Sequence, residues 1–416
     1  MEKTGKKRSL TLEMALGLLL GILTGLLLLF IGGSARGEVT RYIGAVGTVY
    51  LNLIKTVVVP VVTLSVIQGI ISLQDVRRVG AIGAKTVVFY LVTTAFAVAL
   101  GLLFANLLNV AGGYRMPAVI QPVDPGEPTD FLDTVMGIVP SNILTPFMEA
   151  SMLQVILVAL VVGFGVILAG EKGKAASRAV DSFAEVFFRI MDLIIRLSPI
   201  GVFALICPVV ANQGIDVLLP LLRLVGVAYL SYALHMLLIY STFVRLFAGI
   251  GPVRFFREMS RPAVFAFSSA SSVGALPLNL EATKNLGVSQ QIGSFVLPLG
   301  ATINMDGTAI YQGVCAVFIA QVYQVDLSVS QQLMIILTAV LASIGTAGVP
   351  SAGVIMLSMV LQSAGLPLEG IGLVYGIDRI LDMGRTVVNI TGDAACAVCV
   401  NAWETKGRVR QKQRPE

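Results

Sequence analysis

Charged residues are scarce in this sequence of 416 residues, because only 13% of them are Asp, Glu, Lys or Arg. That is about half the share that soluble proteins carry. A soluble protein of this length needs polar side chains to cover its surface, so the scarcity excludes a soluble enzyme. Hydrophobic residues make up 56% of the chain, which excludes a disordered protein. The composition therefore predicts an all-α polytopic membrane protein, since a transmembrane barrel would show short alternating strands.

Residues for metal or redox chemistry are also few. The chain has one histidine, His235, which cannot build a zinc site alone and is interpreted as a packed residue. The four cysteines lie inside apolar runs, and the CxxC spacing of Cys396 and Cys399 is interpreted as small-residue packing. No serine, histidine and acid set exists beyond His235, so the chain is not expected to be an enzyme or to hold a cofactor.

Six apolar segments before residue 250 match the length of about 20 residues that a membrane span needs. They are 14–35, 42–74, 86–114, a fourth that ends in 150–170, then 178–211 and 218–247. Basic clusters follow an even number of spans each time, at Lys3–Arg8, Arg77–Lys85, Lys172–Arg178, Arg245–Arg261 and Lys406–Arg414. By the positive-inside rule both termini are predicted to be cytoplasmic, in the cell (inner) membrane. The net charge of +5 is explained by these clusters, so no nucleic-acid partner is expected.

The last third breaks this alternation. Its apolar stretches are 262–280, 285–325, 327–368 and 370–403. The first is interrupted by "SSASSVGALP" (268–277) and the third by "GTAGVPSAG" (345–353). Unwound backbone at membrane depth requires protein or water around its polar groups, so these segments predict re-entrant hairpins beside a binding site. Kinked spanning helices with packing glycines are the alternative.

Buried charge is concentrated in two motifs of this last third, "NMDGT" (304–308) and "DRILDMGRTVVNITGD" (378–393). An intramembrane charge costs about 2.5–3.5 kcal/mol, so several persist only if they pair or bind ions. At helical spacing, Asp382, Arg385, Asn389 and Asp393 fall within about 80° of one face. Arg385 suits a carboxylate and Asp382 an ammonium group, which together describe an amino acid. Internal pairing of Arg385 with Asp382 for structure alone is the alternative.

Oxygen ligands for a small cation accompany this face. Asp306, Asp393 and the carbonyl groups of "NMDGT" are hard ligands that suit Na⁺. The hairpin tips complete the arrangement, because N–H groups after Ser271 and Ser272 can receive a carboxylate. The glycines of 345–353 suit a gate that closes over a ligand.

The pieces "GATINMDGTA", "SIGTAGVPSAG" and "DMGRTVVNITGD" resemble the glutamate transporter family, the dicarboxylate/amino acid:cation symporters. The resemblance implies eight transmembrane helices plus two re-entrant helical hairpins, an elevator mechanism, a homotrimer, and sodium-coupled uptake of aspartate or glutamate. It implies scaffold helices one and two in 1–81 and four and five in 116–217. It places a transport domain in 82–115 (helix three) and 218–405, with the hairpins at about 255–289 and 327–368, and a cytoplasmic basic tail in 406–416.

The resemblance also assigns residues. The implied substrate site consists of Ser271, Ser272, Thr308, Val349, Gly353, Asp382, Arg385, Thr386 and Asn389. The first implied sodium site consists of Asn389, Asp393 and the backbone of Gly300 and Asn304. The second uses the backbone of Thr302, Ser343, Ile344 and Thr346, and the third uses Asp306, Asn304, Tyr90, Thr93 and Thr94, with Met305 between the sites.

Two positions differ from those of known relatives of the family. Proton-coupled animal relatives carry an acid where this chain has Gln312, so coupling to Na⁺ without H⁺ is expected. Archaeal relatives carry an arginine at the first hairpin tip, where this chain has Ala270, and Arg379 is the candidate to replace it.

A C4-dicarboxylate:cation symporter is the main alternative function. An ion channel, which would pass current without stoichiometric accumulation of solute, is a second one.

Overall fold

The computed structural model describes residues 10–31, 33–79, 81–115, 139–149, 151–343 and 352–412. Every regular element in these residues is helical, as the composition predicts. The longer helices are α1 (Leu10–Ile31), α2 (Gly33–Val79), α3 (Ala81–Leu107), α6 (Met152–Leu168), α7 (Lys174–Arg196), α8 (Ser198–Gln213), α9 (Leu218–Leu234), α11 (Pro252–Ser269), α12 (Ser272–Asn285), α13 (Gln290–Ile303), α14 (Asp306–Val322), α15 (Val329–Ser343), α16 (Ala352–Ser363) and α18 (Asp378–Lys412). The short ones are α5 (Thr145–Met148), η1 (Gly170–Gly173), η2 (Gly214–Val217), η3 (His235–Tyr240), α10 (Ser241–Phe243), η4 (Val244–Ala248), η5 (Leu368–Gly370) and α17 (Ile371–Tyr375).

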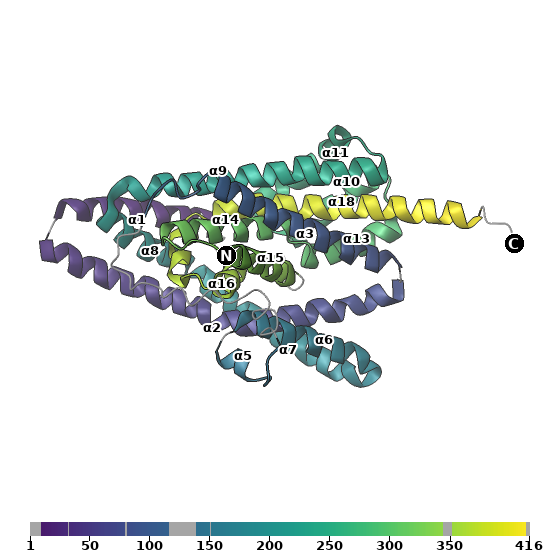
Figure 1. The fold of residues 1–416 in the computed structure, drawn as a ribbon, viewed down its shortest axis with the longest axis horizontal. Helices are drawn as coiled ribbons and strands as arrows, with labels where there is room; N and C mark the ends of the chain where they lie inside the picture. The colour runs from purple at the N-terminus through teal and green to yellow at the C-terminus, as the bar shows by residue number, and fades with distance from the viewer. Residues whose placement is uncertain are drawn as a thin grey trace, which may run out of the picture.

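The helices form an elongated bundle (Figure 1). Within the described residues, two helical segments, Ile82–Leu107 and Leu218–Ala248, are long and apolar enough by themselves to cross a membrane. Five shorter apolar helices accompany them: Leu16–Phe30, Val59–Ile71, Gln154–Leu168, Pro199–Asn212 and Val329–Ser343. Apolar surface is abundant on the outer helices, where Phe30 is 88% and Leu168 77% exposed. An apolar exterior of this kind is typical of a chain whose solvent is lipid.

The first interrupted segment folds as predicted, into two helices rather than one kinked helix. α11 begins at Pro252, which fits the first helical turn because its missing N–H has no partner there anyway. It ends at Ala270, which takes a left-handed conformation with φ of +51°. Ser271 then caps α12, because its side chain accepts a hydrogen bond of 3.1 Å from the N–H of Gly274. α11 and α12 pack against each other as a hairpin.

The second interrupted segment contains α15 and α16, which also pack against each other. The residues that connect them, 344–351, include most of the predicted gate and lie outside the described residues.

The apolar stretch 285–325 is divided, which the sequence did not predict. α13 ends at Ile303 and α14 begins at Asp306, while Asn304 and Met305 have non-helical backbone angles. This break leaves helix-terminal N–H and C=O groups next to the "NMDGT" motif, where side chains or ions must satisfy them.

The predicted fifth span, 178–211, covers two consecutive helices, α7 and α8, because Pro199 in the first turn of α8 removes a backbone donor and favours a new helix start. α18 continues as a helix to Lys412, so it includes the first part of the predicted basic tail. The cytoplasmic location of that tail stays a prediction.

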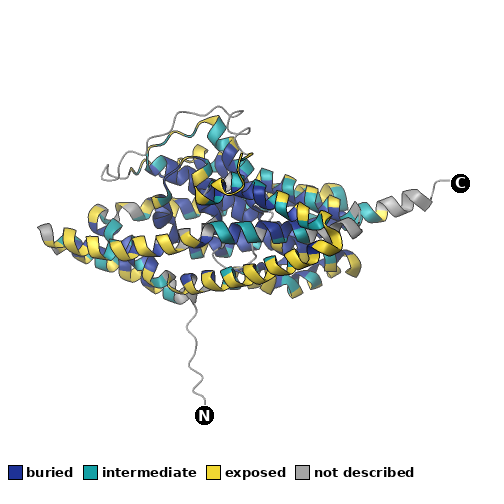
Figure 2. Cartoon of the chain, turned by 90° about the horizontal axis from the view of Figure 1, so that it is seen from below, coloured by how far each residue is buried: buried dark blue, intermediate teal, exposed yellow. Residues whose placement is uncertain are grey.

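The helices pack in two sets of neighbours. α2 contacts α6, α7 and α8, while α8 also lies along α1. α18 contacts α3, α9, α11, α12, α13 and α14, and α14 lies along α3. Burial is greatest in this second set, where α14 is buried along nearly all of its length, and exposed residues dominate the outer helices (Figure 2).

Three of the predicted basic clusters lie near one end of the bundle, and the first cluster, Lys3–Arg8, lies outside the described residues. The α2–α3 connection, the α6–α7 connection and the C-terminal end of α18 all lie at the right in Figure 1. Lys85 at the start of α3 forms an ion pair of 2.6 Å with Glu404 near the end of α18. The even-span rule requires this common end, and the side of the membrane that it faces stays a prediction.

Candidate functional site

The polar face of α18 is buried in the centre of the bundle. Asp382, Arg385, Asn389 and Asp393 are each at most 4% exposed, although three of them carry charge. α18 packs along α14, which is also buried, and Arg385 and Asn389 contact its residues Tyr311 and Gly307. That the four side chains form one ligand-binding site stays a prediction.

The Arg385 centre consists of Arg385, Asp378, Asp382 and Tyr311. The Nε atom of Arg385 donates to Asp382 at 2.8 Å, and its Nη1 atom donates to Asp378 at 3.3 Å. The guanidinium lies over the ring of Tyr311, 4.7 Å from its centroid. Among the described residues, Nη2 of Arg385 and Oδ2 of Asp378 have no hydrogen-bond partner. The centre therefore holds one cation between two carboxylates, with unsatisfied polar atoms of both signs.

Glycines of two other elements lie in close contact with Arg385. A Cβ at Gly353, at the start of α16, would collide with Arg385, and a Cβ at Gly307 would collide with its main chain. Glycine is required at both positions because only a hydrogen fits. The structure thus brings the predicted Gly353 of the second hairpin to the predicted Arg385 of α18.

Arg379 reaches the first hairpin from α18. Its Nη2 atom donates to the carbonyl of Ser269 at 3.4 Å, and its Nη1 atom lies 3.5 Å from Asp382. Arg379 of α18 therefore places a cation at the tip of the first hairpin, where Ala270 provides none.

The Asn304 junction consists of Asn304, Asn389 and Asp393. The side-chain nitrogen of Asn304 donates to the carbonyl of Asn389 at 2.8 Å and to Asp393 at 2.9 Å. Asn389 in turn accepts from the N–H of Gly307 at 2.8 Å, so α18 supports both ends of the break between α13 and α14. The Oδ1 atom of Asn304 is buried and has no partner among the described residues. A free buried acceptor next to a carboxylate fits a small cation.

The Asp306 centre consists of Asp306, Thr94, Tyr240 and His235. Asp306 is 0% exposed and accepts from Thr94 at 2.6 Å and from Tyr240 at 2.7 Å. His235 lies 3.2 Å from the same carboxylate. The interpretation of His235 as merely packed is therefore incomplete, because it is buried but contacts the predicted sodium ligand. No Lys or Arg side chain of the described residues pairs with Asp306, in contrast to the Arg385 centre.

The remaining predicted residues fall into three groups. Buried are Ser272, Thr308, Thr386, Gly300, Met305, Tyr90, Thr93 and Ser343. Ser271 is half-buried and uses its hydroxyl as a helix cap, while Thr302 is exposed. Val349, Ile344 and Thr346 lie outside the described residues.

Sequence reasoning missed four residues of this site: Asp378, Tyr311, Tyr240 and His235. Asp378 had a usable signal, since it lies seven residues before Arg385 and thus only about 20° from it around a helix. The other three lie on α14 and η3, so only the tertiary fold brings them close to the predicted residues. Within the described residues, no group of three or more His, Cys, Asp or Glu side chains could hold a metal ion.

Comparison with known proteins identifies the family to which the chain is similar. The profile of the sodium:dicarboxylate symporter family matches residues 10–403. The chain is 34% identical over 407 residues to the proton/sodium-glutamate symport protein of Geobacillus stearothermophilus, which covers 96% of this chain and 95% of that protein.

Two further relatives differ in what their names say they carry. The proton/glutamate-aspartate symporter of Escherichia coli is 33% identical over 412 residues, covering 96% of this chain and 94% of that protein. The C4-dicarboxylate transport protein 1 of Ralstonia nicotianae is 32% identical over 366 residues, covering 86% of this chain and 85% of that protein.

Proposed function

Because the chain belongs to the sodium:dicarboxylate symporter family, we propose that it moves an acidic amino acid, aspartate or glutamate, into the cell together with sodium ions. Relatives named for glutamate and aspartate transport match nearly the full chain, which supports this substrate class. The family is a family of transporters, so the proposal is a transport function and not an enzymatic one.

The observation that carries the proposal is the Arg385 centre. A side-chain carboxylate of the substrate binds the free Nη2 edge of Arg385, where the guanidinium geometry favours two parallel hydrogen bonds. The ammonium group binds Asp382 and replaces Arg379, whose contact of 3.5 Å is long for an ion pair. The buried hydroxyl groups of Thr308 and Ser272, the tip residue Val349 and the adjacent Thr386 line the same pocket in this proposal.

Two sodium ions bind at Asp393 and Asp306, which have no Lys or Arg partner among the described residues. The first uses the Oδ1 of Asn304 with Asp393, Asn389 and the carbonyl of Gly300. The ion at Asp306 also uses Asn304 and the oxygens of Tyr90, Thr93 and Thr94. The remaining ion is held by backbone oxygens of Thr302, Ser343, Ile344 and Thr346, and closure of the second hairpin completes its site. Several cations offset the repulsion among Asp306, Asp382, Asp393 and an anionic substrate.

The arrangement in the membrane follows the family resemblance. Eight spans and two re-entrant hairpins lie in the inner membrane, with both termini in the cytoplasm. Three protomers assemble through scaffold helices in 1–81 and 116–217, and in each one a transport domain formed by 82–115 and 218–405 moves as an elevator. The packing of α14 against α3 and α18 supports a single transport unit, because these helices share one core.

Uptake of labelled aspartate into proteoliposomes, under Na⁺, H⁺ or K⁺ gradients imposed one at a time, tests substrate and coupling together. We expect accumulation driven by the Na⁺ gradient. The buried Gln312 cannot carry a proton, so a H⁺ gradient alone is expected to drive none. Accumulation driven equally by H⁺ would place this chain with the relatives named for proton coupling.

A C4-dicarboxylate substrate is the second candidate, because one relative at 32% identity is named for it. Succinate has no ammonium group and would leave the buried Asp382 facing an anion. We therefore expect succinate to compete poorly with labelled aspartate, and Asp382→Asn to narrow the difference between the two. Equal competition by succinate in the unchanged protein would favour the second candidate.

A further inference from the structure

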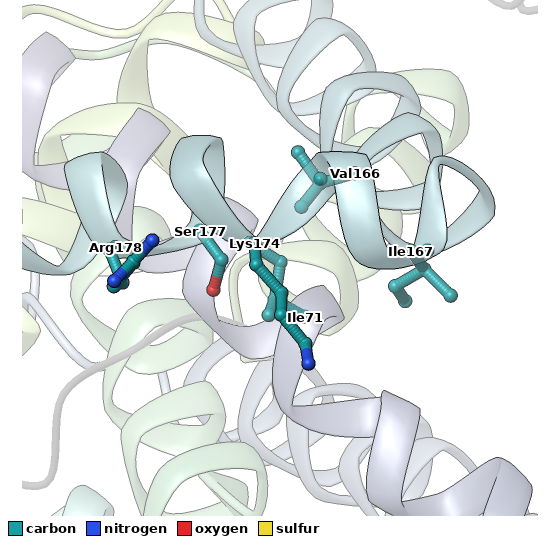
Figure 3. Close-up of a pocket in the computed structure, with 8 residues that line it drawn as sticks. Ile71, Val166, Ile167, Lys174, Ser177 and Arg178 are labelled. Carbon is teal, nitrogen blue, oxygen red and sulfur yellow. The ribbon is translucent and has the colours of Figure 1, made fainter.

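A pocket of about 300 Å³ lies at the end of the bundle that carries the basic clusters, away from the Arg385 centre. Three helices form it, as the close-up shows (Figure 3). Ile71 comes from α2 and Val166 and Ile167 from the end of α6, while Lys174, Ser177 and Arg178 come from the first turns of α7. The remaining lining residues are Gly170 and Gly173 of η1.

The two sides of this pocket differ in chemistry. Ile71, Val166 and Ile167 make one wall apolar, and Lys174, Ser177 and Arg178 make the other basic and hydrogen-bonding. Lys174 pairs with Glu171 at 2.8 Å, but both side chains are more than half exposed, so the pair is easily exchanged. Arg178 is exposed and forms no ion pair with any residue in the described part of the chain. The basic wall is therefore available to an anion.

The apolar wall continues onto a hydrophobic exterior. On α6, Phe164 is 51% and Leu168 77% exposed, and on α7, Phe183 is 60% exposed. A ligand that fits the whole surface has an anionic group for the basic wall and a long apolar part for these helices. Free phosphate has only the first of these features. A phospholipid of the surrounding leaflet has both, and basic pockets between membrane helices bind anionic head groups.

We propose that this pocket binds the head group of an anionic phospholipid, with its phosphate at Lys174, Ser177 and Arg178 and its acyl chains along α6 and α7. The proposal requires only that the chain lies in a membrane, so it is independent of the transported substrate. The ammonium of Lys174 leaves its ion pair with Glu171 and binds the lipid phosphate instead. The partial positive charge at the N-terminus of α7 adds to the attraction.

The test is a titration of the purified full chain in neutral detergent with short-chain phosphatidylglycerol, followed by the shift in thermal unfolding midpoint. The double variant Lys174→Gln/Arg178→Gln should weaken the apparent affinity roughly 20-fold, about fivefold for each charge removed. Lys174→Arg/Arg178→Lys should restore it, since both charges return. The matched control is Arg254→Gln/Arg257→Gln, two exposed basic residues of α11, which should leave the titration unchanged.

Three outcomes would overturn the proposal. Equal weakening in the α11 control would show attraction to net charge only. Equal shifts with short-chain phosphatidylcholine would show an apolar groove without head-group recognition. Inorganic phosphate that reproduces the shift at the same concentrations, with the same loss in the pocket variant, would show a site for free anions instead of lipid.

Discussion

The Arg385 centre and the Asp306 centre are both buried and both contain carboxylates, but they are neutralised differently. In the Arg385 centre the cation is part of the chain, held by Asp382 at 2.8 Å and Asp378 at 3.3 Å. In the Asp306 centre the carboxylate accepts hydrogen bonds from the hydroxyls of Thr94 and Tyr240, and the ring of His235 lies 3.2 Å from it. A buried charge must be paired, so in the proposed function the first centre receives a zwitterionic substrate and the second a cation from outside. The difference predicts that substitutions in one centre change substrate affinity and those in the other change sodium dependence.

Arg385→Cys is expected to have the largest effect. It leaves Asp378 and Asp382 buried without their cation, at a cost of about 3–5 kcal/mol, so aspartate uptake should fall more than 100-fold. Neutral amino acids should become better substrates because the site no longer requires a carboxylate. Competition of uptake by a panel of amino acids measures both changes. Arg223→Cys, at an exposed position of α9, is the control and should keep the original profile.

Asp306→Asn should change the sodium dependence of uptake more than the choice of substrate. The amide keeps the hydrogen bonds from Thr94 and Tyr240 in part but removes the charge that a sodium ion needs. We expect the Na⁺ concentration for half-maximal uptake to rise at least tenfold, measured at saturating aspartate. Asp326→Asn, an exposed acid beyond α14, serves as the control. An unchanged Na⁺ dependence with altered substrate choice would reverse the assignment of the two centres.

Asp378→Asn tests whether Asp378 fixes Arg385 or competes with the substrate for it. If Asp378 fixes the guanidinium, losing this charge-assisted hydrogen bond of 3.3 Å should weaken aspartate binding about tenfold. Binding isotherms with aspartate at saturating Na⁺ measure this. Tighter binding would show that Asp378 occupies a place that the substrate needs.

Arg379→Gln should have the smallest effect, about threefold on aspartate affinity. The side chain of Arg379 is 16% exposed. Its contacts with the carbonyl of Ser269, at 3.4 Å, and with Asp382, at 3.5 Å, are both long and therefore weak. Initial uptake rates at low aspartate concentrations measure the change. A loss as large as that of Arg385→Cys would mean that both arginines contact substrate directly.

The polar face of α18 was predictable because its residues belong to one helix and obey one spacing. Asp382, Arg385, Asn389 and Asp393 needed no knowledge of any partner. The first hairpin was predictable as well, since Ser, Gly and Pro between 268 and 277 disfavour a continuous helix.

The Asp306 centre was only partly predictable. Tyr240 and His235 come from η3, which lies far from "NMDGT" in sequence, and no local pattern connects them. The break at Asn304 and Met305 contains no proline or glycine, so it was hidden inside an apolar run. It is held open by tertiary contacts, namely the hydrogen bonds from Asn304 to Asn389 and Asp393.

α18 carries residues of both the Arg385 centre and the Asn304 junction. Asp378 and Asp393 stand 15 positions apart on α18, a separation of about 22 Å along its axis. Asn389 lies between them and touches both sides of the α13–α14 break, through its carbonyl to Asn304 and its amide oxygen to Gly307. A displacement of α18 along its axis would therefore move the polar groups of the Arg385 centre and of the Asn304 junction together. A distance label on α18 would report on both positions in one measurement.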